Sequence, residues 1–438
     1  MKEISILMRM KQSLQSILPP QDQRTEISPY DFVVNLMFCF RRDTKLASLE
    51  GLRRTMKERL RKNISRSAFW ERLSRKRLNT FLTQAVSTLM TQLCQKAGYG
   101  TRLLKELGVK GIQLVDSSSF TLWDGLSERF PGTLMSAGIK WHACFNLLSG
   151  TLSWFEFSSS ASHDRHHFPK IQSLQGQLTI FDLGYWDYSL LLAIERRGGF
   201  FLSRVKSNAV LPIAEVISGL SPGSIGKDLL SLPFGKKRQD VIEVRIEKPH
   251  QGQKLSCRAI GFWNQTEHLY HFYLTNLLVP AAIIYPLYRL RGQIELIFKS
   301  NKSSLNADPM TSNNPNIIEN LLLASLAGHL ASSSISSIGQ AQLKREQKFA
   351  ISFQRVAKIA VLLAEDLVGF FLEHTSRAFE NLLWKIRLFA DEIFDPNYKH
   401  RETSLMRLQR VLDEEIKKLR ETTRPHTNHQ HLSLKNAA

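Results

Sequence analysis

The sequence has little cysteine and no long hydrophobic run at its start. Its four cysteines stand singly, at Cys39, Cys94, Cys144 and Cys257. Because no CxxC pair occurs, the chain predicts neither a zinc site nor a disulfide framework, and it fits a reducing cytosol. Residues 1–20 lack a sustained apolar region and a cleavage site, so we expect no signal peptide.

Acidic residues are also scarce relative to basic ones. The 438 residues include 59 Lys and Arg against 39 Asp and Glu, a formal net charge of +20, and the isoelectric point is near 9.9. Proteins with such an excess of basic residues usually bind polyanions such as nucleic acids. A hydrophobic content of 43% is enough for a real core. The length suggests two or three domains.

No stretch is predicted to span a membrane. The most apolar helical stretch that the pattern indicates, residues 356–372, is interrupted by Lys358, Glu365 and Asp366. Charged residues at the centre of a span are costly, so we expect a helix of the protein core and no membrane partner.

Residues 288–302 carry the most informative pattern, Tyr288-x2-Arg291-x3-Glu295-x6-Lys302. On one α-helix these four side chains would project within an arc of about 60°. A carboxylate between cations and a phenol suits metal-dependent phosphoryl transfer, since the carboxylate can bind a hard cation while Arg and Lys hold phosphates. The alternative is a solvated amphipathic face with an ordinary Arg–Glu pair.

Two aspartates upstream favour the first interpretation. Asp116 follows the apolar run 111–115, and Asp182 follows the run 178–181. Each run predicts a buried strand that is closed by a turn, and the ends of such strands form the crevice where open α/β sheets bind ligands. Taken singly, either aspartate is more often a turn residue or a helix cap. Together with Glu295 they indicate a site for a divalent cation, because three converging carboxylates repel one another.

With these residues the chain resembles the DDE transposases of bacterial insertion elements, specifically the insertion sequence 4 family. The signature Tyr-x2-Arg-x3-Glu-x6-Lys stands unbroken, and the motifs around Asp116 and Asp182 resemble those of the first two family aspartates. The strand 272–277 resembles the one that precedes the signature. The resemblance covers about residues 105–310. One position departs from the family, which usually carries an aromatic where this chain has Gly292.

The resemblance implies a fold and a chemistry. The fold is α/β, with a ribonuclease-H-like (retroviral-integrase-like) catalytic core, a β-rich insertion, and helical N- and C-terminal regions. Asp116, Asp182 and Glu295 would be catalytic and would hold two Mg²⁺ ions, for which Mn²⁺ is expected to substitute. Tyr288, Arg291 and Lys302 would bind DNA phosphates and set the geometry of an in-line displacement.

The same resemblance implies partners and a place in the cell. The partners are duplex DNA, as the terminal inverted repeats of an element and its target, and a second copy in a synaptic homodimer. The location is the bacterial cytoplasm, in association with DNA. The predicted activity is strand cleavage and strand transfer at element ends. The alternatives are a structure-specific nuclease of the same fold and a decayed copy that only binds DNA.

The chain divides into four predicted regions. Residues 1–104 are helical and basic, with 14 Lys or Arg against 4 Asp or Glu in 41–77, which favours a DNA-binding domain over a solvated basic face. Residues 105–310 form the catalytic domain, and 207–279 form the β-rich insertion within it. Residues 311–438 are helical, with a polar tail after Pro396 that looks disordered from 424.

Several other residues are candidates for a functional site. Stacking on a displaced base needs an aromatic face, and the insertion offers four candidates by position: Trp263, Tyr270, His271 and Tyr273. The cluster 163–167 is rich in His, but adjacent loop residues rarely converge on one metal ion. Asp124, Asp164 and Asp187 end no apolar strand and are set aside. Candidates for a DNA groove, ranked low, are Lys140, His142, Arg204 and Lys206.

Overall fold

One mixed sheet organises the molecule, and its described strands pair in the order β3-β2-β1-β4-β5-β9-β8-β7-β6. The computed structural model describes residues 4–18, 26–39, 48–94, 101–234, 239–304, 312–340, 342–343, 351–373, 375–397, 400 and 402–422. The strands are β1 Gly111–Thr121, β2 Gly138–Asn146, β3 Thr151–Ser159, β4 Gln177–Phe181, β5 Phe200–Arg204, β6 Ile213–Ser218, β7 Val241–His250, β8 Gln253–Asn264 and β9 Leu269–Thr275.

The first five strands form the ribonuclease-H-like core that the sequence predicts. β1, β2 and β3 are antiparallel neighbours, whereas β4 pairs in parallel with both β1 and β5. The turn between β2 and β3 contains Gly150 at φ 68°, a backbone conformation that glycine adopts without strain. Helix α7 (Tyr188–Arg196) crosses from β4 to β5, and Asp187 begins it by accepting from two backbone amides.

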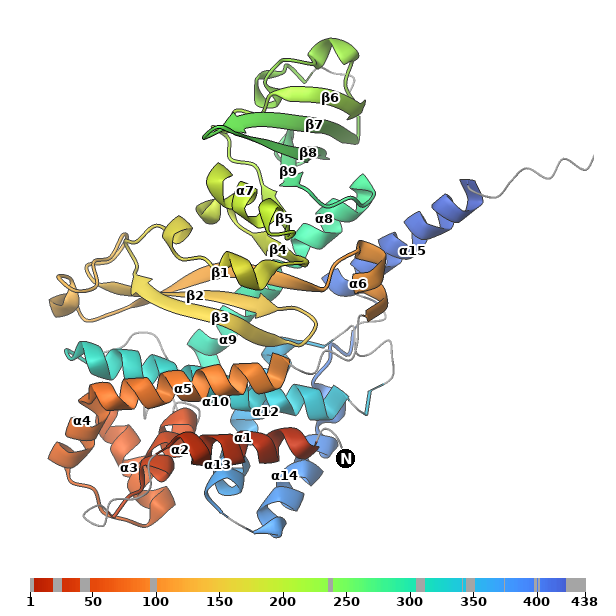
Figure 1. The fold of residues 1–438 in the computed structure, drawn as a ribbon. Coiled ribbons are helices and arrows are strands. Elements are labelled where there is room, and N and C mark those ends of the chain that lie inside the picture. The colour runs from red at the N-terminus through yellow and green to blue at the C-terminus, as the bar shows by residue number, and fades with distance from the viewer. Residues whose placement is uncertain are drawn as a thin grey trace, which may run out of the picture.

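The β-rich insertion extends the same sheet. Strand β9 pairs antiparallel with β5, and β8, β7 and β6 follow outward, as Figure 1 shows toward the top. Strands β7 and β8 stay paired as far as His250 and Gln253. Gln251 and Gly252, both at positive φ, make a two-residue turn whose twist matches antiparallel strands.

Helices from both ends of the chain pack together on the side of β1–β3 that lies toward the bottom of Figure 1. Helix α10 contacts α1, α2, α4 and α5 from the N-terminal region and α12 and α14 from the C-terminal region, and α5 and α10 both contact β3. The N-terminal helices are α1 Ile4–Ile17, α2 Pro29–Cys39, α3 Leu49–Leu60, α4 Arg66–Ser74, α5 Lys76–Cys94 and α6 Thr101–Leu107. The later helices are α8 Ala281–Arg289, α9 Gly292–Ser304, α10 Pro315–Gln340, α12 Phe353–Leu362, α13 Ala364–Leu372, α14 Ser376–Leu388 and α15 Ser404–Thr422.

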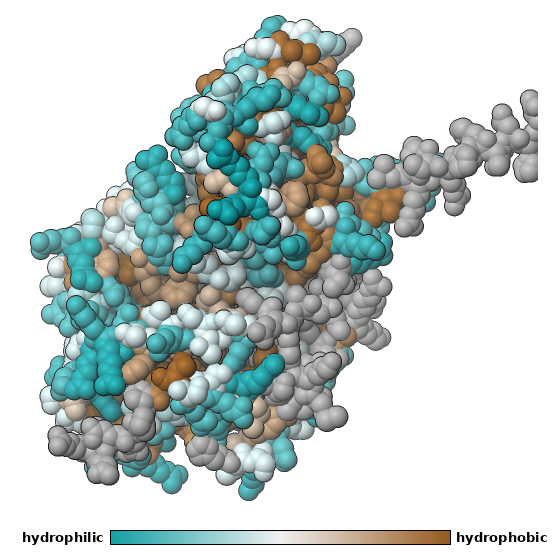
Figure 2. Space-filling model, in the orientation of Figure 1, coloured by the Kyte–Doolittle hydropathy of each residue, from teal (hydrophilic) through white to brown (hydrophobic). Residues whose placement is uncertain are grey.

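Among the described helices, α10 is the longest. Its segment Pro315–Gly339 is long and apolar enough to cross a membrane by length and composition alone, but 83% of its most apolar window is buried inside the protein. The stretch 356–372 is divided between α12 and α13. A hydrophobic helix that is covered on all sides by other helices is a core helix. The side of the molecule that Figure 2 shows is mostly hydrophilic.

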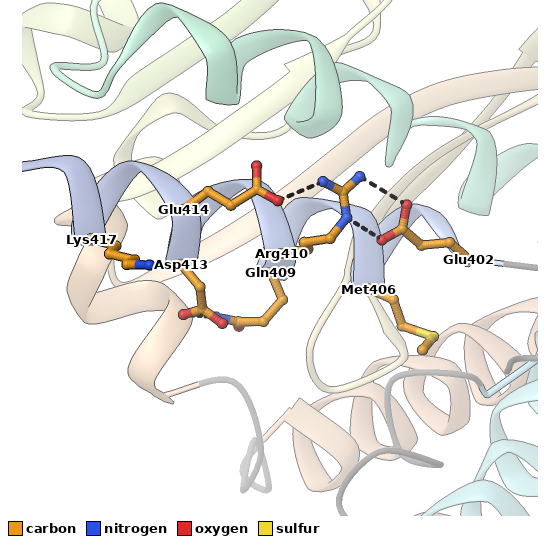
Figure 3. Close-up of a pocket in the computed structure, with 7 residues that line it drawn as sticks. All are labelled: Glu402, Met406, Gln409, Arg410, Asp413, Glu414 and Lys417. Carbon is orange, nitrogen blue, oxygen red and sulfur yellow. Dashed lines mark hydrogen bonds and ion pairs between the residues drawn. The ribbon is translucent and has the colours of Figure 1, made fainter.

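The C-terminal helix α15 was not predicted, because its sequence is strongly polar. Its charges pair along the helix: the Arg410 guanidinium contacts Glu402 and Glu414, as Figure 3 shows. Pairs one turn apart stabilise an exposed helix. These side chains line a shallow pocket of about 520 Å³, together with Met406, Gln409, Asp413 and Lys417. The predicted disordered tail, 424–438, lies outside the described residues.

Candidate active site

Strand register places the two aspartates side by side. Val115 of β1 is the parallel partner of Phe181 of β4, so Asp116 and Asp182 come next on neighbouring strands. Asp182 follows the last residue of β4, as predicted. Asp116 does not end its strand, which corrects the prediction: β1 continues to Thr121, because residues 116–121 remain paired with β2.

The signature residues do not lie on one continuous helix. Helix α8 ends at Arg289 and α9 begins at Gly292. Between them the backbone tightens, since the amide of Arg291 donates to the carbonyl of Tyr288 and that of Ile294 to Arg291, both over three residues. Glycine is a weak helix former, and the break falls next to it. The expectation that the four signature side chains share one face of a single helix is therefore wrong.

The break nevertheless directs the signature side chains toward the aspartates. The Arg291 guanidinium lies 2.7 Å from Asp116, 2.5 Å from Glu295 and 4.0 Å from Asp182. The Tyr288 hydroxyl donates to Asp182 at 3.5 Å. The three carboxylates are thus gathered around one cationic group, although the chain separates Asp116 from Glu295 by 178 residues.

Burial differs sharply among the three carboxylates. The Asp116 side chain is 14% exposed, against 42% for Asp182 and 54% for Glu295. The pKa of Asp116 is raised to about 6, chiefly by burial and also by the neighbouring carboxylates, although Arg291 and the amide of Ser117 lower it. The same carboxylates raise the pKa of Arg291 despite its burial. Burial also raises the pKa of Tyr288, so its phenol stays protonated and acts as a donor.

Lys302 lies at the far side of a pocket beside Asp116. Its ammonium donates to the carbonyl of Ser119 and sits 5.0 Å from the Phe120 ring centroid. The pocket has a volume of about 470 Å³, and its lining combines carboxylates, lysines and hydroxyls: Asp116, Ser117, Ser118, Glu295, Phe298, Lys299 and Lys302. Such a lining can accept a phosphate-bearing strand next to the carboxylates.

Carboxylate oxygens are suitable ligands for a divalent cation, but in this structure the Arg291 guanidinium lies between the three carboxylates. Among the residues that the structure describes, no group of three His, Cys, Asp or Glu side chains is gathered so as to hold a metal ion. The His-rich cluster 163–167 lies within the described residues, so the same statement applies to it. Oxygen donors converging on a guanidinium form the donor set that a divalent cation prefers, provided that Arg291 moves away.

The other candidates fall outside this group. Tyr270 and Tyr273 are buried, and Tyr273 packs against Tyr288 with ring centroids 4.8 Å apart, so neither presents a free face to a base. Trp263 packs edge-on against Tyr270, and His271 pairs with Glu267. His142 is fully buried. Asp164 was set aside on the sequence because no local pattern distinguishes it. In the structure its carboxylate contacts Ser117 and Lys140.

Comparison with known protein families gives a match to this chain. Residues 108–330, just over half of the chain, match the family model described as a transposase DDE domain. The chain belongs to the DDE transposase family. The match confirms the family resemblance drawn from the signature.

The DDE transposase relatives come from insertion elements. The transposase of IS231F from Bacillus thuringiensis subsp. israelensis is 25% identical over 324 residues, which cover 64% of this chain and 68% of that protein. The transposase of IS1151 from Clostridium perfringens is 24% identical over 231 residues, 43% of this chain and 49% of that one. A piggyBac transposase synaptic complex with hairpin DNA aligns over 88% of this chain and 83% of that chain, with a TM-score of 0.40 and 12% identity.

Some cations of the predicted DNA-binding segment 41–77 pair with groups inside the protein. Arg53 pairs with Glu50, Arg59 with Glu365, and Arg72 donates to the carbonyl of Ile27. Residues 41–47 lie outside the described part of the chain. The described cations that remain exposed include Arg61, Arg66 and Lys76. The basic surface of this region is therefore smaller than the count of charges suggests.

Proposed function

We propose that this DDE transposase cleaves DNA strands at the ends of an insertion element and joins them to a target, in a reaction that depends on Mg²⁺ or Mn²⁺. The observation that carries the proposal is the convergence of three carboxylates, from the neighbouring strands β1 and β4 and from helix α9, on one cationic group. A structural ion pair needs only one carboxylate per arginine. Three around one guanidinium suit a site built for a higher positive charge.

Asp116, Asp182 and Glu295 would hold the divalent cations. When bound, these cations supply an activated oxygen nucleophile and charge stabilisation at the leaving oxygen. Asp116 is the most buried of the three and is held by the amide of Ser117, which donates to Oδ1 at 2.8 Å. A carboxylate fixed in this way loses little freedom on binding a cation.

The signature cations and the phenol would hold the DNA. Lys302 faces the pocket from the far side, and its ammonium suits a phosphate as a point charge. Arg291, once released from the carboxylates, presents a planar fork that matches a phosphate. Tyr288 donates from a buried hydroxyl and is positioned by its packing on Tyr273. Duplex DNA is the proposed partner, and a homodimer the proposed synaptic form.

Gly292 does not argue for a decayed copy. A Cβ placed on it meets no atom within 4 Å, and its backbone needs no positive φ. No close approach within the described protein requires glycine at this position. The position is open to a larger side chain and carries no packing defect.

The test uses a plasmid that carries the coding region with its natural flanking DNA. Purified full-length protein and Mg²⁺ should release DNA ends at the element boundaries, and chelation of the cation should stop the release. Asp116→Asn, Asp182→Asn and Glu295→Gln should each lower cleavage by at least about a thousandfold while DNA binding survives, because binding rests on other groups. Cleavage near the wild-type rate by any of the three would remove that residue from the site.

A further inference from the structure

Asp164 braces the site from the side of the sheet opposite to α9. Successive residues of a strand point to opposite faces, so Asp116 faces Arg291 whereas Ser117 faces the other way. There the Ser117 hydroxyl donates to Asp164 Oδ1 at 3.1 Å. Asp164 begins the short 3-10 helix η3 (Asp164–His166), between β3 and β4. It therefore touches the residue that directly follows Asp116.

Lys140 fixes the Asp164 carboxylate in place. Its ammonium donates to the same oxygen at 2.9 Å and also to the carbonyl of Ser162 at 2.8 Å. The two side chains are only 13% and 24% exposed, for Lys140 and Asp164 respectively. An ion pair that is largely removed from water and shares further hydrogen bonds has one preferred geometry.

Asp164 also touches the turn that follows Asp182. Gly184 lies in the 3-10 turn η5 (Leu183–Tyr185), two residues after Asp182. A Cβ on Gly184 would be 2.6 Å from Asp164 Oδ2 and 3.4 Å from Asp164 Cβ. Only a residue without a side chain lets this backbone approach so closely. One carboxylate thus contacts the neighbours of both aspartates of the site.

We infer that Asp164, held by Lys140 and packed on Gly184, is a positioning residue that sets the spacing of Asp116 and Asp182. This inference rests on the proposed function, because the spacing matters if the two aspartates share divalent cations. Residues that orient metal ligands through hydrogen bonds typically change metal affinity or activity by about 10- to 100-fold when mutated. Asp164 acts through its contacts with Ser117 and with the turn at Gly184, and this role needs no contact with DNA.

The experiment measures two properties of the full-length protein. The first is the affinity for Mn²⁺ alone, without DNA, from the electron paramagnetic resonance signal of the free ion. The second is the single-turnover cleavage rate on the plasmid with the natural flanking DNA. Asp164→Ala and Gly184→Ala should each weaken Mn²⁺ binding and slow cleavage by about 10- to 100-fold. DNA affinity should stay within about twofold, since phosphate contacts dominate it.

Two further variants separate positioning from general stability. Asp164→Asn keeps the oxygen that accepts from Ser117 and Lys140, so it should recover most of the Mn²⁺ affinity. The double variant Asp164→Ala, Gly184→Ala should be no worse than the poorer single variant, because the methyl added at position 184 meets chiefly the carboxylate that Asp164→Ala removes. Additive losses in the double variant would overturn the inference.

Asp187→Ala is the matched control. Asp187 accepts from the amides of Ser189 and Leu190 at the start of α7, so its loss affects stability in the same part of the fold. It should leave Mn²⁺ affinity unchanged. If Asp187→Ala weakens Mn²⁺ binding as much as Asp164→Ala, the positioning role falls and the proposed function stands. If Asp116→Ala also leaves Mn²⁺ binding and cleavage intact, the proposed function falls, and this inference with it.

Discussion

Arg291 reaches across 175 positions of the sequence to place its guanidinium 2.7 Å from the Asp116 carboxylate. In doing so it takes the position between the three carboxylates that a divalent cation would need. Arg291 and a cation therefore compete for the same negative charge. This relationship connects the stability of the protein to its proposed chemistry.

The first prediction concerns that competition. Without divalent cations, Arg291→Ala leaves the three carboxylates uncompensated and should lower the melting temperature by a few degrees, about the effect of 1–3 kcal/mol. Added Mn²⁺ should then raise the melting temperature more in the variant than in the wild type. Arg289→Ala removes an exposed arginine from the same segment and is the control. An equal Mn²⁺ response in wild type and variant would show that Arg291 does not hold the cation position.

The second prediction concerns Gly292. Alanine is favoured over glycine in a helix by about 1 kcal/mol, and its Cβ meets open space here, so Gly292→Ala should stabilise the protein by about 0.5–1 kcal/mol. Gly369→Ala, at an equally open position in α13, should give a similar gain in urea unfolding. Gly292→Trp should also stabilise and should cleave at least as fast as the wild type. A drop in both properties would mean that the bent backbone needs glycine for another reason.

The third prediction is a pH dependence of stability that depends on His142. Burial lowers its pKa to about 3 in the folded protein, with His167 and Lys140 lowering it and Asp164 raising it. The unfolded chain takes up this proton near pH 6.5, so the folded state loses stability as the pH falls below that value. Each pH unit between about 6 and 4 costs up to about 1.4 kcal/mol from this group.

His142→Gln should remove that contribution. Glutamine can still bond to Tyr185 and Ser158, which His142 contacts at 3.3 and 2.8 Å. The free energy of unfolding in urea, measured at pH 7, 6 and 5, should fall less steeply in the variant than in the wild type. His166→Gln changes an exposed histidine of the nearby loop and serves as the reference. Parallel pH curves for wild type and His142→Gln would contradict the assignment.

The fourth prediction tests the N-terminal region as a DNA-binding domain. The triple variant Arg61→Gln, Arg66→Gln, Lys76→Gln should reduce the salt dependence of DNA binding by up to three counterions, because each phosphate contact releases about one. The comparison is a triple variant on α15 with equal charge loss: Arg407→Gln, Lys417→Gln and Lys418→Gln. The full chain is used because α5 packs against α10 and a fragment would expose that surface. Equal slopes for the two triple variants would place recognition elsewhere.

Local patterns in the sequence were sufficient for part of the site. The spacing from Tyr288 to Lys302 is a property of one short segment, and the run before Asp182 predicts a strand that ends where the structure ends it. Hydrophobic periodicity reports which face of an element is buried, and Leu287, Leu290 and Ile294, which recur at helical spacing, are buried in the structure.

Contacts between distant segments were decided only by the tertiary structure. The register of Val115 with Phe181, the burial of Tyr273 and the contact of Asp164 with Gly184 leave no trace in local periodicity. The break between α8 and α9 is a further case, because helical spacing alone does not distinguish one helix from two that bend toward the carboxylates. A sequence pattern records what each residue prefers, whereas the site depends on which preferences packing brings together.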